Sequence, residues 1–170
     1  MAEIQDTAAA LSKDDEEKVS LIVDLLNNGA TLKDIKGLSD EQMESIYALG
    51  VNFYKLGRIA EAEKIFKFLV FFDYYCQKYW VGMGAVHQLQ KHFEQARVAY
   101  EYAALLDITQ PKPIYHAAEC YLALGRIEDA EATLDALEEE CPPENELNKK
   151  YLAKGVKLRQ LIEKVKATKK

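Results

Sequence analysis

The chain repeats one pattern of small and large residues three times, at a constant step of 34 positions. The step joins three sets of residues: Gly50, Gly84 and Ala118; Ala62, Ala96 and Ala130; and Phe66, Tyr100 and Leu134. Two antiparallel helices pack closely only where a side chain is small, and large side chains fill the wedges beside such crossings. A unit of this length cannot bury its apolar face alone, so successive units must stack on one another. The period therefore predicts a solenoid of helix pairs.

A period of 34 residues with this spacing is typical of tetratricopeptide repeats. We predict an all-α protein, a right-handed superhelix of three such repeats at about 43–76, 77–110 and 111–144. Two flanking parts complete the predicted organisation: an N-terminal segment, 1–42, and a basic C-terminal helix in 145–170. The scarcity of proline and glycine, with 4 and 8 residues, agrees with a helical chain that has few tight turns.

Residues that begin and connect helices recur in the same register. Ser39 and Gln42 have the spacing of a capping box, which predicts the start of a helix at the first repeat. Gly57 and Gly125 follow the first helix of their units, where the chain turns through a positive φ. Lys91 holds that place in the middle unit. We therefore expect the middle turn to be strained or differently shaped.

Apolar residues at helical spacing predict one amphipathic helix on each side of the repeats. The upstream helix runs from about residue 13 to residue 28. Its stripe consists of Val19, Ile22, Val23, Leu25 and Leu26, and the downstream stripe of Leu147, Tyr151, Leu158, Ile162 and Val165. The last unit of a solenoid leaves one face open unless a further element covers it. We expect the downstream stripe to cover the third repeat.

Charge and cysteine content predict a cytosolic protein. The net charge is −6, but nine Lys/Arg and two Asp/Glu give residues 145–170 a charge of +7 and leave −13 elsewhere. Because an acidic body repels phosphate groups, we expect no nucleic-acid partner. Cys76, Cys120 and Cys141 lack metal-ligand spacing, which favours a reducing compartment. The N-terminus is acidic, unlike a signal peptide, and no apolar run reaches the roughly 18 residues of a membrane span, so we expect no stable membrane association.

No motif predicts catalysis, a metal site or a cofactor. The sequence has no glycine-rich phosphate loop, no CxxC pair and no HExxH helix. His87 occupies a position that an aromatic residue holds in the other repeats, which favours a packing role. His116 and Glu119 lie three residues apart on one helix face, but a di-metal centre needs several such pairs. We therefore expect a protein that is not an enzyme.

The first helix of each unit lines the concave face of a superhelix of this type. Positions five, nine and twelve of each unit are expected to point into this groove. They are Tyr47, Val51, Tyr54, Val81, Ala85, Gln88, Tyr115, Glu119 and Leu122. Tyrosine offers a wide apolar face and a hydroxyl group at little cost in side-chain entropy. This lining predicts a peptide-binding groove.

Three segments resemble the class II chaperones of bacterial type III secretion systems. They are residues 68–75 (FLVFFDYY), 79–85 (YWVGMGA) and 102–120 (YAALLDITQPKPIYHAAEC). The resemblance extends from about residue 20 to residue 140. One departure is the segment 87–90 (HQLQ), where related sequences tend to have an Arg-Gln pair.

The resemblance implies a chaperone of hydrophobic translocator proteins. Such a chaperone works in the bacterial cytoplasm and holds an extended, proline-containing client segment in its groove before export. For this chain, the resemblance implies client contacts at Tyr47, Tyr54 and their groove neighbours. It also implies a homodimer when the protein is free, formed through the stripe Val19, Ile22, Val23, Leu25 and Leu26.

Other functions stay open at this point. An adaptor that grips a C-terminal carboxylate would carry Lys and Asn at positions five and nine of the first repeat, where this chain has Tyr47 and Val51. A structural scaffold of the secretion apparatus, or a regulatory adaptor of its gene expression, would use the same repeats for another peptide partner. An enzyme is the third alternative, which a metal analysis that finds bound zinc or iron would favour.

Overall fold

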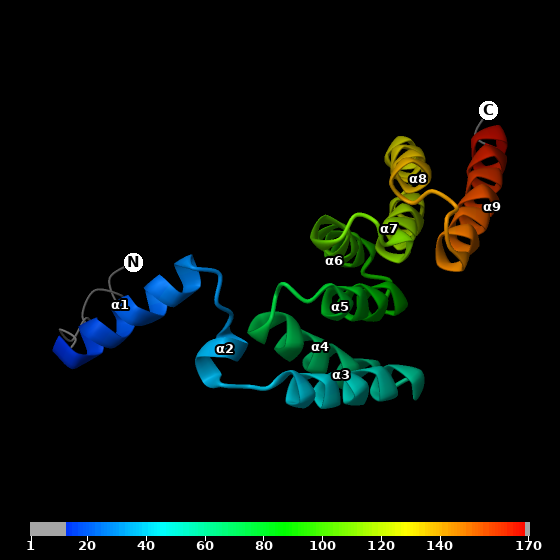
Figure 1. Ribbon diagram of the computed structural model, residues 1–170. Helices are drawn as coiled ribbons and strands as arrows, with labels where there is room; N and C mark the ends of the chain where they lie inside the picture. The colour runs from blue at the N-terminus through cyan, green and yellow to red at the C-terminus, as the bar shows by residue number, and fades with distance from the viewer. Residues whose placement is uncertain (1–12, 169–170) are drawn as a thin grey trace, which may run out of the picture.

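The computed structural model describes residues 13–168, and all nine regular elements in that range are α-helices. They are α1 (Lys13–Asn27), α2 (Leu32–Lys36), α3 (Asp40–Lys55), α4 (Ile59–Phe72), α5 (Gln77–Leu89), α6 (Phe93–Leu106), α7 (Pro111–Ala123), α8 (Ile127–Glu140) and α9 (Glu146–Thr168). Helices α3 to α8 stack in chain order, α1 projects from one end, and α9 lies at the other end (Figure 1). The predicted all-α fold is confirmed. Within the described part of the chain, no helix is long and apolar enough to span a bilayer.

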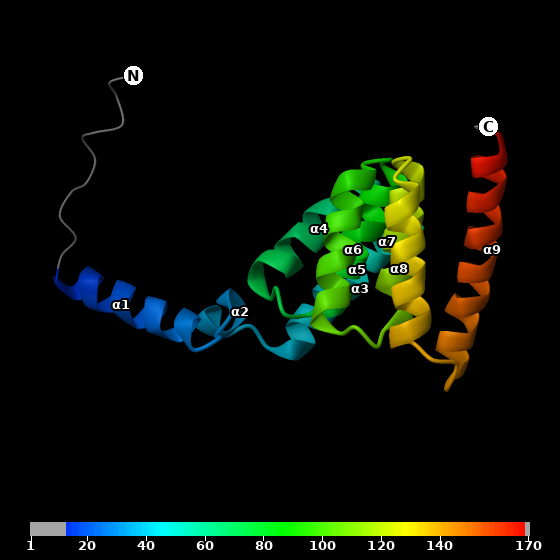
Figure 2. The ribbon, with the colours of Figure 1, turned by 90° about the horizontal axis from the view of Figure 1, so that it is seen from above.

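The stack consists of three helix pairs, α3–α4, α5–α6 and α7–α8, in two layers. The first helices of the pairs form one layer and α4, α6 and α8 form the other (Figures 1 and 2). The repeated large residues Phe66, Tyr100 and Leu134 lie on the second helices and are among the most deeply buried side chains. The 34-residue pattern therefore places one large side chain in the core of each pair.

The predicted capping box and two equivalent aspartates mark helix boundaries in the stack. Ser39 is the N-cap of α3: its hydroxyl accepts a hydrogen bond from the Gln42 amide, and the Gln42 side chain accepts one from the Ser39 amide. Helices α4 and α6 end at Phe72 and Leu106, and equivalent residues, Asp73 and Asp107, are their C-caps. The capping box thus opens the stack at Asp40, three residues before the predicted start of the first repeat.

The turns between paired helices have one conformation in all three repeats. Gly57 and Gly125 have φ values of 73° and 75°, and Lys91 has a φ of 61°. In each turn the amide of this residue and the next amide donate to carbonyls of the preceding helix, as Lys91 does to Gln88 at 3.0 Å. The middle turn is therefore not differently shaped. A lysine occupies a left-handed conformation there, which costs a residue with a Cβ roughly 1–2 kcal/mol.

Replacing Lys91 with glycine is expected to raise the free energy of unfolding by about 1 kcal/mol, because it removes this backbone strain. Urea unfolding followed by circular dichroism measures the change. The reciprocal variant, Gly125→Lys, should lower stability by a similar amount. Equal stability of the Lys91→Gly variant and the wild type would show that the turn is not strained.

Helix α9 covers the open end of the third repeat, as the sequence predicts. It packs against α7 and α8. Tyr151, Leu158 and Ile162 are buried in one cluster with Leu134 and Leu137 of α8. The first residue of the predicted stripe, Leu147, lies outside this cluster and is exposed. The third repeat thus has a capping helix that supplies its missing neighbour.

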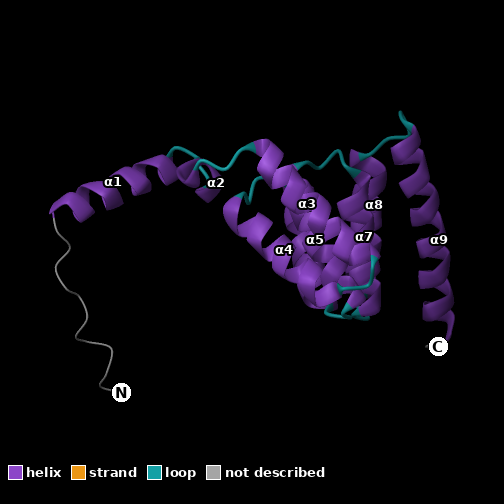
Figure 3. Cartoon of the chain, turned by 90° about the horizontal axis from the view of Figure 1, so that it is seen from below, coloured by secondary structure: helices purple, strands orange, loops and turns teal. Residues whose placement is uncertain are grey.

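A short helix that the sequence analysis did not predict, α2, connects α1 to the stack. Thr31 is its N-cap and forms a capping box with Asp34, and Gly37 ends the helix in a left-handed conformation. Helix α2 contacts α4, whereas α1 extends away from the stacked repeats (Figure 3). The N-terminal segment is therefore anchored by α2, and α1 stands apart.

Candidate peptide-binding face

The first helices of the three pairs, α3, α5 and α7, are linked by side-chain contacts. Lys78 of α5 forms an ion pair with Glu44 of α3. Gln88 of α5 donates a hydrogen bond of 3.2 Å to Glu119 of α7. We call the predicted groove residues on these helices the first-helix face; they are Tyr47, Val51, Tyr54, Val81, Ala85, Gln88, Tyr115, Glu119 and Leu122.

Aromatic contacts organise the part of the first-helix face on α3. The ring centroid of Tyr47 lies 6.0 Å from that of Phe66 and 5.7 Å from that of Tyr79. The Lys78 ammonium lies 4.9 Å from the Tyr47 ring centroid, within the range of a cation–π interaction. Burial raises the pKa of the Tyr47 hydroxyl, so it remains protonated at neutral pH. Tyr47, Val51 and Tyr54 are each half-buried and keep surface available to a ligand.

A polar network connects the middle of the face to the third repeat. Tyr100 donates a hydrogen bond of 2.9 Å to the Gln88 side-chain oxygen. Glu119 accepts hydrogen bonds from Gln88, from the Tyr115 hydroxyl at 2.8 Å and from His116 Nδ1 at 2.7 Å. Burial acts to raise the pKa of Glu119, but these three hydrogen bonds outweigh it and hold the pKa below its usual value. Glu119 is therefore an ionised residue that fixes its neighbours.

Two predicted groove residues are almost fully buried. Val81 and Tyr115 have exposed fractions of 9% and 8%, whereas Ala85, Leu122 and the other members of the face are partly exposed. Val81 belongs to the core between α5, α6 and α7, and Tyr115 belongs to the core that includes α9. Both side chains pack in the core beneath the first-helix face. Direct contact with a ligand at these two positions stays a prediction.

Residues outside the predicted set also border the face. Tyr151 of α9 lies beside Tyr115, with 5.6 Å between ring centroids, and the Lys154 ammonium lies 5.2 Å from the Tyr115 centroid. Lys78 and Lys112 hold position two of their repeats, three residues before the position-five residues. The prediction used only positions five, nine and twelve of each repeat and therefore left these residues out. Position two lies on the same helix face as position five, and including it would have found Lys78 and Lys112.

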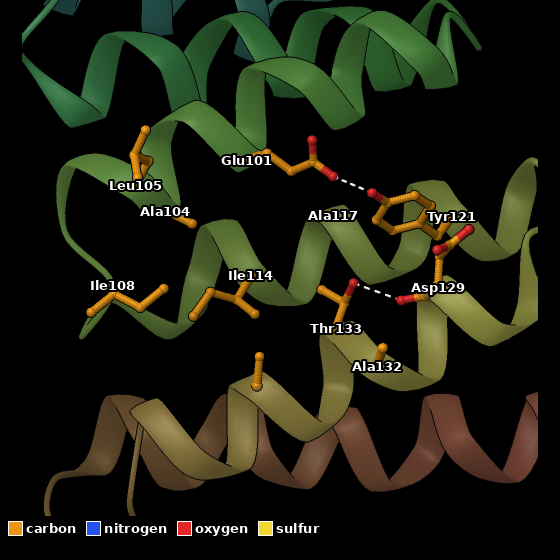
Figure 4. Close-up of a pocket in the computed structure, with 11 residues that line it drawn as sticks. Glu101, Ala104, Leu105, Ile108, Ile114, Ala117, Tyr121, Asp129, Ala132 and Thr133 are labelled. Carbon is orange, nitrogen blue, oxygen red and sulfur yellow. Dashed lines mark hydrogen bonds between the residues drawn. The ribbon is translucent and has the colours of Figure 1, made fainter.

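The opposite side of the stack has two hollows that are related by the 34-residue step. The larger, of about 440 Å³, lies between α6 and α8 with α7 as its floor, and Figure 4 shows its lining. Tyr121 donates to Glu101 across it. Its counterpart in the preceding repeat has a volume of about 340 Å³ and includes His87, which is half-buried with its Nδ1 3.3 Å from Gln90 Oε1. Thr133 of the larger hollow bonds to the Asp129 carbonyl of its own helix.

The described residues do not form a metal-binding cluster. Across residues 13–168, no three His, Cys, Asp or Glu side chains come together in an arrangement that could hold a metal ion. His116 and Glu119 are hydrogen-bonded to each other and to tyrosine and glutamine neighbours. Burial raises the pKa of Cys76, Cys120 and Cys141, which disfavours the reactive thiolate form.

The predicted dimerisation stripe is exposed in the monomer. Val19, Ile22, Val23, Leu25 and Leu26 of α1 have exposed fractions between 38% and 47%. Neighbouring Leu21 is 60% exposed. An isolated helix of this length gains little stability on its own, and helices in proteins depend on packing of an apolar face. The stripe on α1 is therefore a surface without a partner within the described chain.

Comparisons with known proteins place the chain in a family. Tetratricopeptide-repeat models match residues 43–75 and 88–148. The chaperone protein SicA of Salmonella typhimurium is 34% identical over 131 residues, which cover 76% of this chain and 79% of SicA.

Solved structures with the same fold come from type III secretion systems. A chain in a type III secretion complex from Aeromonas hydrophila superposes with a TM-score of 0.81 at 32% identity, over 87% of this chain and 98% of that chain. The type III secretion chaperone SycD of Yersinia enterocolitica, in complex with a peptide of the translocator YopD, superposes with a TM-score of 0.68 at 29% identity, over 78% and 98% of the two chains. SycD has also been solved as an alternative dimer. This chain therefore belongs to the tetratricopeptide-repeat family of type III secretion translocator chaperones.

Proposed function

We propose that this protein is a non-enzymatic chaperone that binds extended, proline-containing segments of hydrophobic translocator proteins on its first-helix face. The observation that carries the proposal is the set of partly exposed apolar and aromatic side chains on the first-helix face, which are Tyr47, Val51 and Tyr54 on α3, Ala85 on α5 and Leu122 on α7. The YopD peptide bound to SycD supports this class of client. The protein would act in the bacterial cytoplasm, without a cofactor and without nucleic acid.

The geometry suits an extended peptide. A translocator that inserts into a membrane exposes apolar segments, which aggregate unless they are covered. The first-helix face offers side-chain contacts spaced along three helices, and the hydroxyl groups of the partly exposed Tyr47 and Tyr54 suit hydrogen bonds with the backbone of a peptide. Ordering a flexible segment costs conformational entropy, so such binding is reversible and permits release at export.

The parts of the chain divide this work in the proposed function. Residues 43–144 bind the client, residues 145–170 cap the third repeat, and residues 1–42 carry the dimerisation stripe. The alternative dimer of SycD supports self-association in this family. The exposed stripe on α1 is the surface that we assign to it.

Co-expression with the hydrophobic translocators of the same bacterium tests the proposal. The tagged chain is expected to elute as a soluble complex with one or both translocators. The variant Tyr47→Ala with Tyr54→Ala should weaken binding of a client peptide roughly a hundredfold, because aromatic residues at the centre of an interface carry most of its energy. Calorimetry measures the affinity.

A matched control separates binding from folding. Phe71→Ala with Tyr75→Ala removes two exposed rings that lie outside the first-helix face, and should leave client binding unchanged. Ala85→Trp should block the face without removing a packed ring. If the pull-down is empty although the protein is folded, the chain is a scaffold or a regulatory adaptor for another peptide partner.

A further inference from the structure

Three lysine side chains gather at the α7–α9 end of the first-helix face. Lys112 lies one turn before Tyr115 on α7, and Lys150 lies one turn before Lys154 on α9. The Lys154 ammonium lies 5.2 Å from the Tyr115 ring centroid and 4.9 Å from that of Tyr151. The contact between α7 and α9 therefore brings the lysines of both helices to one place beside the face.

This lysine cluster, Lys112, Lys150 and Lys154, has no carboxylate partner in residues 13–168. Other basic side chains, such as Lys78 and Lys166, form ion pairs. The first turn of α7 also lacks an acidic residue and its N-cap has no side-chain hydrogen bond, so the positive end of the helix dipole adds to the same field.

The cations of the cluster act on one another. Partial desolvation of the Lys112 ammonium lowers its pKa, and the nearby positive charges of Lys150 and Lys154 lower it further. An anion placed among them would relieve this repulsion, and the cost of gathering three like charges would then be offset by ligand binding.

We propose that the lysine cluster binds an acidic side chain of the client, so that the recognised segment combines apolar residues with an aspartate or glutamate at its α7–α9 end. This inference rests on the proposed function and specifies its ligand. The cluster adjoins Tyr115, a member of the first-helix face, so a peptide bound along that face would lie beside the cluster. A nucleic acid is the less suitable ligand, because residues outside 145–170 carry a charge of −13 and repel phosphates.

Overlapping synthetic peptides that cover the co-expressed translocators serve as the probe. The peptide that binds the wild type most tightly is expected to contain Asp or Glu next to its apolar stretch. Changing that acid to its amide should weaken binding about five- to tenfold at low ionic strength. The variant Lys112→Gln with Lys154→Gln should bind the acidic peptide with the same loss of affinity. It should also bind the acidic peptide and its amide form equally well.

Two controls keep the result interpretable. Lys36→Gln with Lys64→Gln removes two exposed charges that lie on α2 and α4, outside the first-helix face, and should not change peptide affinity. Lys112→Gln with Lys150→Gln leaves the contacts of Lys154 with the tyrosine rings intact, and should still weaken binding of the acidic peptide. High salt should reduce the difference between the acidic peptide and its amide form, because screening weakens such pairs.

The outcomes distinguish this inference from the proposed function. If a peptide binds and the Tyr47→Ala, Tyr54→Ala variant loses it, but neither lysine variant nor salt changes its affinity, the inference is wrong and the proposed function stands. If poly(U) RNA binds through the lysines while peptide affinity is unaffected, the cluster is a nucleic-acid site and the inference is equally wrong. If no peptide binds, both proposals fail together.

Discussion

Replacing Gly84 with alanine is expected to lower the free energy of unfolding by about 2 kcal/mol. Gly84 lies on α5 where α6 crosses it, and a Cβ at this position would come within 2.7 Å of the Tyr100 ring. Tyr100 is 1% exposed and its hydroxyl is bonded to Gln88, so the ring has no space into which it can move. The cost outweighs the gain of about 1 kcal/mol that alanine brings to a helix interior. Thermal and urea unfolding measure the difference.

The repeat itself supplies the compensating change. In the third repeat the equivalent pair is Ala118 with Leu134, so a larger residue at the crossing accompanies a smaller one on the second helix. Gly84→Ala should therefore cost at least 1 kcal/mol less in a Tyr100→Leu background than in the wild type. Gly155→Ala on α9 is the matched control, because its Cβ would meet only methyl groups at the tips of Leu137, at 3.3 Å, and Leu134, at 3.5 Å. If the effects of Gly84→Ala and Tyr100→Leu on stability are additive, a clash between the alanine Cβ and the Tyr100 ring does not cause the loss.

The 34-residue period predicted the repeats because one geometric requirement recurs in each of them. Every pair needs a small residue at its crossing and a large residue beside it, and the chain meets this need in register. The turn at Lys91 shows that this packing requirement also fixes the turns. Its backbone keeps the conformation of Gly57 and Gly125 although the residue is a lysine. The pattern of neighbouring repeats therefore overrides a local preference.

Features outside the period were harder to predict. Helix α2 spans five residues, too few for an apolar period, and its only signal is the capping box of Thr31 and Asp34. The lysine cluster joins Lys112 to residues 38 or more positions later, on a helix that lies outside the repeats. The angle at which α9 meets α7 decides that contact, and no repeated position encodes it. The repeat predicts which positions form the first-helix face. It does not predict how deeply each one is buried, because the burial of Tyr115 depends on α9, which lies outside the repeats.

Introducing Glu at Val23 and Leu26 is expected to convert the free protein from a dimer into a monomer. Both residues lie in the exposed stripe of α1, which extends away from the stacked repeats. Two such surfaces can cover each other in a dimer, and burial of apolar area is the dominant favourable term in association. Two carboxylates per chain on this stripe would have to be buried without partners, which costs several kcal/mol for each ion. Multi-angle light scattering measures the mass.

The control changes the charge on the polar side of α1 by the same amount. Glu17→Gln with Asp24→Asn alters two exposed residues that lie across the helix from Val23 and Leu26, and should leave the dimer intact. Circular dichroism should show the same unfolding of the repeats in both variants, because α3 to α9 form their cores without α1. A dimer that persists in the Val23→Glu, Leu26→Glu variant would place self-association on the repeats. A monomeric wild type would show that self-association does not cover the α1 stripe.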